Sequence, residues 1–177
     1  MDVGSAATTP LASLRAETLS LSQMPSGWSA RQSTYDVRMG CLTGLLEPRG
    51  VTQTHVVEVY YLGRGSLPQL IETLSTYSNA QLAYQKIAST IAACRTVSGV
   101  LKGYAVTGTV RPMASVHYGN SSVVYALTLS GAHVTWRSDY AIVRKGNVII
   151  TVLEGSYPAV SDVQFSHFVA TAVAKVK

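Results

Sequence analysis

HVTWRSDYAIVRKGNVIITVLEGS, residues 133–156, is the stretch that decides the fold. It holds two runs rich in β-branched and aromatic residues, joined at RKGN by a compact turn signal. Two such runs around a short turn are typical of paired antiparallel strands. In the first run Val134, Trp136, Tyr140 and Ile142 alternate with polar residues. One face is therefore predicted to pack on a core, and the other to meet water or a ligand.

Three further stretches predict strands by the same criteria. They are THVVEVYYLGRG (54–65), YAVTGTVRPM (104–113) and SSVVYALTLSG (121–131). The turn signal SGAH separates the last of these from the opening stretch. We therefore expect the final three strands to form an antiparallel meander.

Helical spacing of apolar residues predicts three helices. The first lies in SLPQLIETLSTY (66–77), with Ser66 as its cap, the second in SNAQLAYQKIASTIAACRTVS (78–98), and the third starts near Ser161. Helices interspersed with antiparallel strands indicate an α+β fold. We expect an antiparallel β-sheet with helices packed on one face and a cleft on the other.

Length and composition suit one domain. The chain has 177 residues, of which 1–15 read as a flexible N-terminal tail and 16–177 as a single sensor-like domain. Only 13% of the residues are charged, about half the roughly 25% usual in soluble domains. The sequence has no run of 18 apolar residues, so no membrane-spanning helix is predicted. Its first residues lack the apolar segment of a signal peptide.

The charge distribution is uneven. The net charge is +5, and no Asp or Glu occurs from Thr73 through Ser138. If the basic residues of that stretch share a face, the face would attract anions. They are single rather than clustered, and no nucleic-acid-binding motif is present. We therefore expect no nucleic-acid partner.

Sequence motifs offer little catalytic chemistry. The four histidines are isolated, and neither Cys41 nor Cys94 has another Cys or His at ligand spacing, so no metal site is predicted. No catalytic or phosphate-binding motif predicts an active site or a cofactor. The two cysteines fit either of two states, a pair of free buried thiols or a disulfide.

The polar face of the opening stretch is the candidate binding surface. Arg137 of this stretch could hold a carboxylate or phosphate through paired hydrogen bonds together with Arg111, which lies with Thr107 and Thr109 on a neighbouring strand. A solvated sheet face with an Arg–Asp pair is the simpler alternative. The candidate residues are Arg111, His133, Thr135, Arg137 and Asp139.

Several stretches together resemble a known family. They are MPSGW (24–28), Cys41, STYSNAQLAYQKIASTIAACRTVS (75–98), SDYAIVRKGNVIITV (138–152) and the closing helix. This pattern is similar to the extracellular sensor domain of the mycobacterial receptor kinase PknH and of related actinobacterial envelope lipoproteins. The resemblance implies an extracytoplasmic α+β domain with a cleft, and a disulfide between Cys41 and Cys94. The family domain looks stapled by two disulfides, whereas this chain can form one.

The resulting hypothesis is a non-catalytic, extracytoplasmic ligand-binding or sensor-type module of the bacterial cell envelope. It would be secreted or anchored as a lipoprotein, through a lipidated Cys upstream of Met1. Its ligand would be a small molecule, lipid or glycan of the envelope. Two alternatives are an envelope hydrolase whose site assembles in the same cleft, and a protein-interaction domain.

Overall fold

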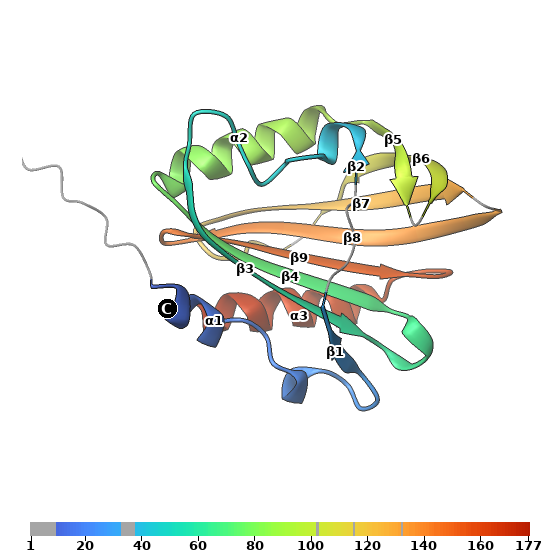
Figure 1. Ribbon diagram of the computed structural model, residues 1–177, viewed down its shortest axis with the longest axis horizontal. Helices are drawn as coiled ribbons and strands as arrows, with labels where there is room; N and C mark the ends of the chain where they lie inside the picture. The colour runs from blue at the N-terminus through green and yellow to red at the C-terminus, as the bar shows by residue number, and fades with distance from the viewer. Residues whose placement is uncertain (1–9, 33–37, 102, 115, 132) are drawn as a thin grey trace, which may run out of the picture.

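The computed structural model describes residues 10–32, 38–101, 103–114, 116–131 and 133–177. Within them, one antiparallel sheet of nine strands has the order β1-β3-β4-β9-β8-β7-β6-β5-β2 (Figure 1). The strands are β1 (Ser29–Arg31), β2 (Arg38–Met39), β3 (Gln53–Leu62), β4 (Gln69–Tyr77), β5 (Thr96–Leu101), β6 (Tyr104–Pro112), β7 (Ser121–Gly131), β8 (Val134–Lys145) and β9 (Val148–Ser156). The helices are α1 (Leu11–Ala16), α2 (Ala80–Ala93) and α3 (Asp162–Lys175), with 3-10 turns η1 (Leu21–Gln23), η2 (Gly40–Leu42) and η3 (Arg64–Ser66).

Strands β5 to β9 follow one another across the sheet, each antiparallel to the next. The predicted three-strand meander is confirmed, and β6 and β5 extend it. Gly146 in the β8–β9 turn has φ 59°, a conformation that glycine adopts without a side-chain clash. The α+β class with an antiparallel sheet is confirmed as well.

The predicted helix over residues 66–77 is wrong, because this segment contains strand β4. Leu70 and Leu74 are both fully buried on one face of the sheet. A spacing of four residues keeps two side chains on one face of a strand as well as on one face of a helix. Strand β4 lies inside the sheet between β3 and β9 and is buried on both faces, so it lacks the alternation that marks a half-exposed strand.

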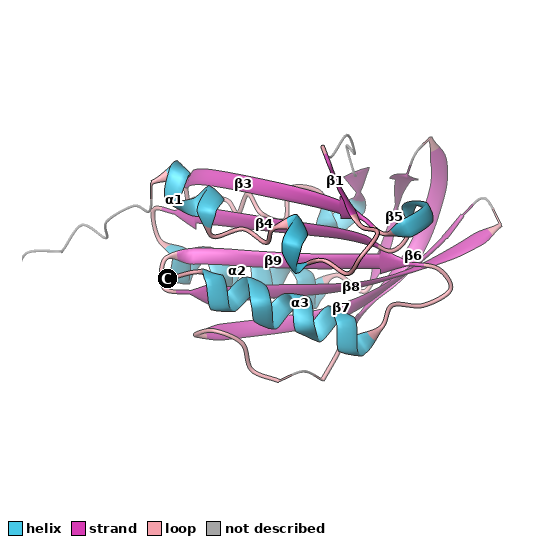
Figure 2. Cartoon of the chain, turned by 90° about the horizontal axis from the view of Figure 1, so that it is seen from below, coloured by secondary structure: helices cyan, strands magenta, loops and turns pink. Residues whose placement is uncertain are grey.

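Helices cover both faces of the sheet rather than one, which corrects the expected layering. Helix α2 lies on one face, and α3 crosses β8 and β9 on the other (Figures 1 and 2). Each helix closes its own apolar core. Ile87 and Ile91 of α2 pack with Ile149, while Phe168 of α3 packs with Ile150.

Helix α2 forms where the apolar stripe predicted it. Ala80, Tyr84, Ile87 and Ile91 are buried on its sheet-facing side. Asn79 caps the start, because its side-chain oxygen accepts a 2.9 Å hydrogen bond from the backbone N–H of Leu82. This bond satisfies one of the amide groups left without a partner in the first helical turn.

Replacement of Asn79 by Ala should lower the free energy of unfolding by about 1 kcal/mol, because the first turn loses its side-chain acceptor. Urea unfolding of the two proteins measures the difference. Asn79→Ser is the control, since a serine hydroxyl can serve as the acceptor and should retain most of the stability. An equal loss in both variants would contradict the capping role.

The third helix and the N-terminal segment pack against each other. Lys175 near the end of α3 donates to the carbonyl of Thr18 and, at 3.1 Å, to Gln23. Helix α1 begins at Leu11, within the last residues of the predicted tail, and buries Leu14 completely. Residues 1–9 of the predicted tail lie outside the described part of the chain.

Candidate functional site

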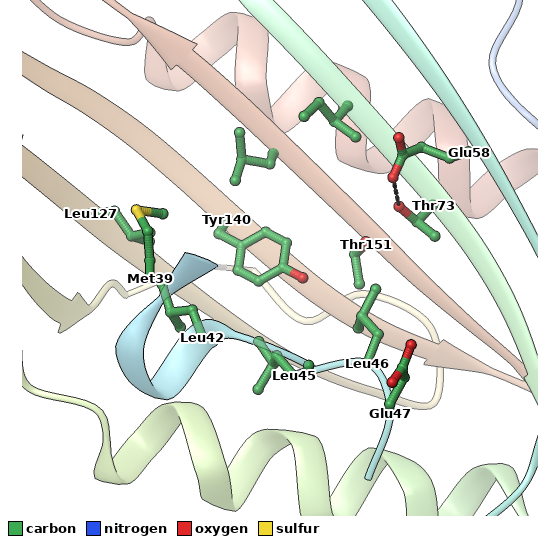
Figure 3. Close-up of a pocket in the computed structure, with 13 residues that line it drawn as sticks. Met39, Leu42, Leu45, Leu46, Glu47, Glu58, Thr73, Leu127, Tyr140 and Thr151 are labelled. Carbon is green, nitrogen blue, oxygen red and sulfur yellow. Dashed lines mark hydrogen bonds between the residues drawn. The ribbon is translucent and has the colours of Figure 1, made fainter. Parts of the chain in front are cut away.

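A wall segment, residues 39–47, stands over the face of the sheet that α2 also covers (Figure 3). At its start, Met39 pairs with Gly99 of β5. At its end, the Tyr77 hydroxyl donates a 2.7 Å hydrogen bond to the carbonyl of Leu46. Both ends of the segment are therefore held to the sheet.

A disulfide fastens the wall segment to α2. Cys41 and Cys94 are bonded, with their Cα atoms 5.9 Å apart. The disulfide implied by the resemblance is confirmed, and it uses both cysteines of the sequence. Cys94 is the C-cap residue of α2 and is 3% exposed. The bond therefore ties the wall segment to the hydrophobic core.

The space between the wall segment and the sheet is a cleft of about 330 Å³. Its sheet side is built by side chains from β3, β4, β7, β8 and β9, and Tyr140 lies in its middle (Figure 3). Seven of the lining side chains are Leu, Ile or Met. The lining residues are Met39, Leu42, Gly44, Leu45, Leu46, Glu47, Glu58, Ile71, Thr73, Leu127, Tyr140, Thr151 and Leu153.

The polar groups of the cleft are hydroxyls and two carboxylates. Burial raises the pKa of Tyr140 well above its ordinary value, although a hydrogen bond with Thr151 opposes the shift, so the phenol stays neutral at physiological pH. Glu47 and Glu58 are exposed residues of the lining. Among the described lining residues there is no His, Ser, Cys, Lys or Arg. The cleft therefore offers apolar contact with a negative edge.

The predicted binding residues lie on the opposite face of the sheet. Thr135 and Arg137 are exposed there on β8, and Arg111 is exposed on β6. Strand β7 separates β6 from β8, so the two are not the neighbours that the sequence suggested. His133 lies in the turn before β8 with φ 64°, outside the strand. The ligand-binding role of these residues stays a prediction.

Asp139 belongs to the same face but is not accessible. It is 6% exposed and lies directly opposite Glu154 of β9, which is 1% exposed. Gln164 of α3 donates a 2.9 Å hydrogen bond to Glu154. The start of α3 therefore covers this carboxylate pair, and Asp139 cannot form the surface ion pair with Arg137 that was the simpler alternative.

Sequence reasoning missed the cleft because it placed Tyr140 in a closed core. The signal available was the apolar density of the loop CLTGLLEPRG, residues 41–50. A loop with three leucines among glycines and a proline is unusual for a segment that only crosses the surface. Nothing in the spacing of those leucines indicated which face of the sheet they would cover.

One antiparallel sheet with helices on both faces and a disulfide-fastened wall segment defines the class of this chain, a one-sheet α+β domain. Its particular fold is similar to the crystal structure of the extracellular domain of PknH from Mycobacterium tuberculosis. The TM-score is 0.66 at 15% identity, over 96% of this chain and 99% of that one. The resemblance read from the sequence is thus confirmed at the level of the fold.

A second solved structure shares the fold. It is a putative uncharacterised protein of Mycobacterium smegmatis, an Rv0999 ortholog, with a TM-score of 0.55 at 12% identity, over 94% of this chain and 96% of that one. No family model and no curated protein matches the sequence. Within the described residues, no helix is long and apolar enough to cross a membrane. Nor do they place three or more His, Cys, Asp or Glu side chains together as a metal site.

Proposed function

We propose that this chain is an extracytoplasmic ligand-binding module of the sensor type, without catalytic activity, that binds its ligand in the cleft beneath the wall segment. The disulfide supports an extracytoplasmic location, because such bonds persist in oxidising compartments. The similarity of this fold to that of a receptor kinase's extracellular domain supports the sensor type. A secreted form and a form held by an upstream lipidated Cys both fit this location, and detergent phase partition of the native protein separates them.

The apolar lining of the cleft carries the proposal. Its volume of about 330 Å³ lies at the lower end of the roughly 300–1,000 Å³ typical of small-molecule sites. Leu153 and Ile71 are paired across β9 and β4 on the sheet side, and both are only half-buried. Partly exposed apolar side chains in a fixed depression favour a ligand with an apolar body.

The edge of the cleft selects the polar end of that ligand. Glu47 and Glu58 are the charged residues of the described lining, and both are acidic. A charged binding surface favours partners of opposite charge and disfavours partners of like charge. The ligand class is therefore an amphiphile whose polar end donates hydrogen bonds or carries a positive charge.

Leu153→Trp should weaken the binding of an apolar ligand roughly tenfold or more, because the indole fills the space that the ligand needs. Titration with the neutral fluorescent dye N-phenyl-1-naphthylamine measures the affinity. Val163→Trp is the matched control, since Val163 is 82% exposed on α3, across the sheet from the cleft. Equal dye binding by wild type and Leu153→Trp would refute the cleft as the site.

The polar end is tested by displacement of the dye. Dodecyltrimethylammonium should compete better than dodecyl sulfate of the same chain length, and Glu47→Gln with Glu58→Gln should remove the difference. Turnover of ester, phosphate or glycoside substrates by the wild type, lost in Leu153→Trp, would instead establish a hydrolase in the same cleft.

A further inference from the structure

A second concave surface lies on the α3 side of the sheet, where β5, β6 and β7 lie beside one another. This hydroxyl platform is a shallow depression of about 480 Å³. It is lined by side chains of β5, β6 and β7, which form two rows that continue in register onto β8, beyond the depression itself. The first row is Ser98, Thr107, Ser130 and Thr135, and all four residues are exposed.

The second row contains Thr96, Thr109, Thr128 and Arg137. Its last two members are joined, because Nη1 of Arg137 donates a 3.2 Å hydrogen bond to the Thr128 hydroxyl. In the first row the Ser130 and Thr135 hydroxyls are 3.1 Å apart. These contacts hold the side chains at the β8 end of both rows in place.

The charged side chains of the platform itself are both basic. Arg137 closes the second row, and Arg111 follows Thr109 by two residues, so it shares the same face of β6. Strands β5, β6 and β7 lie wholly within the stretch that contains no Asp or Glu. Acidic side chains border the platform beyond Arg137: Asp139 of β8 is buried beside Glu154, and Asp162 at the start of α3 is exposed and close enough to act on Asp139. Exposed strand faces often carry charged pairs of opposite sign, whereas this one carries guanidinium groups among hydroxyls.

Serine and threonine hydroxyls both donate and accept hydrogen bonds, as sugar hydroxyls do. Guanidinium groups form paired hydrogen bonds with carboxylate or phosphate. A neutral glycan would not need the arginines, and a simple anion would not need two rows of hydroxyls. We propose that the hydroxyl platform is a second binding site, which takes an acidic saccharide with its sugar hydroxyls on the two rows and its anionic group on Arg137 and Arg111.

Calorimetric titration of the full chain with hexagalacturonate tests the site, beside maltohexaose and inorganic phosphate. Arg111→Gln with Arg137→Gln should weaken hexagalacturonate binding on the order of tenfold or more, because two charged contacts are lost. Arg95→Gln is the control for the loss of one charge and is compared with Arg137→Gln alone. It removes one exposed positive charge near Tyr125, on the α2 side, and should change the affinity less than twofold. Equal weakening by Arg95→Gln would reduce the effect to unspecific charge attraction and overturn the proposal.

The hydroxyl rows are tested with the charge unchanged. Thr107→Val with Ser130→Ala should also weaken hexagalacturonate binding, while phosphate binding stays the same. If these two substitutions leave hexagalacturonate binding unchanged, or if phosphate alone binds equally well, the surface is an adventitious anion site only. Maltohexaose binding of equal strength would likewise refute the role of the arginines. Leu153→Trp should leave hexagalacturonate binding intact, so failure of this site and failure of the cleft are distinguishable.

Discussion

Replacement of both cysteines, Cys41→Ser with Cys94→Ser, should lower the free energy of unfolding by about 4 kcal/mol. The disulfide joins residues that are 53 positions apart. In the chain-entropy model, opening a loop of that size releases about 4 kcal/mol of restraint on the unfolded chain. This is a large share of the roughly 5–15 kcal/mol that stabilises a typical domain. Replacing both residues avoids leaving a reactive thiol in the core, where Cys94 is 3% exposed.

The same change should affect the cleft more than the rest of the molecule. The wall segment would keep its pairing with β5 and the bond from Tyr77 to Leu46, but it would lose its covalent connection to α2. We expect weaker dye binding under conditions in which the variant is still folded, and unchanged hexagalacturonate binding at the hydroxyl platform.

Guanidinium unfolding followed by tryptophan fluorescence measures the stability, and wild type with reduced cysteines is the control that should behave like the double variant. Thiol titration of the unreduced, denatured wild type should find no free cysteine, and reduction should release two. An unchanged unfolding midpoint together with unchanged dye binding would show that the bond constrains neither the fold nor the cleft.

Long segments with one clear period were predictable from the sequence. Helix α2, helix α3 and strands β3, β6, β7, β8 and β9 lie where periodicity placed them. The errors occurred where the period was ambiguous or the segment short. Strand β4 has apolar residues on both faces, and β5 is six residues long with Gly99 inside it. Strand β2 has two residues and exists because it pairs with β5, which no local pattern encodes.

In the strands that were predicted, the face of a residue was predictable, but its accessibility was not. Alternation placed Thr135, Arg137 and Asp139 on one face, and the structure agrees. Whether a residue on that face is free depends on how far α3 extends over the sheet, which is decided by the packing of Phe165 and Phe168. Asp139 is covered and Arg137 is not, although they are two positions apart. The sequence did not predict that the hydroxyl side chains of β5 and β7 belong to this surface for the same reason, because the order of strands in a sheet is a tertiary property.

The domain should become less stable as the pH rises from about 4.5 to about 7. Three carboxyl side chains, those of Glu72, Asp139 and Glu154, are buried on the α3 side of the sheet. Burial raises the pKa of Glu72 to about 7, although the N–H of Leu19 and the charge of Lys175 oppose the shift. Burial also raises the pKa of Asp139, and the charge of Asp162 adds to that shift. Burial likewise raises the pKa of Glu154; the charge of Asp139 adds to this shift, and the hydrogen bond from Gln164 opposes it.

The sign follows from proton binding. Between the ordinary carboxyl pKa of 4.5 and the raised value of about 7, the folded state binds more protons than the unfolded state. Stability therefore falls across that interval as pH rises, and it levels off above it. A shift of this size at Glu72 corresponds to about 3 kcal/mol, and the Asp139–Glu154 pair acts in the same direction. Protonation of that pair relieves the repulsion between two carboxylates directly opposite each other.

Urea unfolding at pH 5 and pH 8 measures the effect, and Glu154→Gln localises it. The neutral side chain should raise stability at pH 8 by about 1–3 kcal/mol and leave it nearly unchanged at pH 5, because the wild-type carboxyl is then largely protonated. Glu58→Gln is the control, since that carboxylate is exposed on β3, and it should alter the pH dependence little. A wild-type protein more stable at pH 8 than at pH 5, or a Glu154→Gln variant with the wild-type pH dependence, would show that these carboxyls do not govern the stability of the domain.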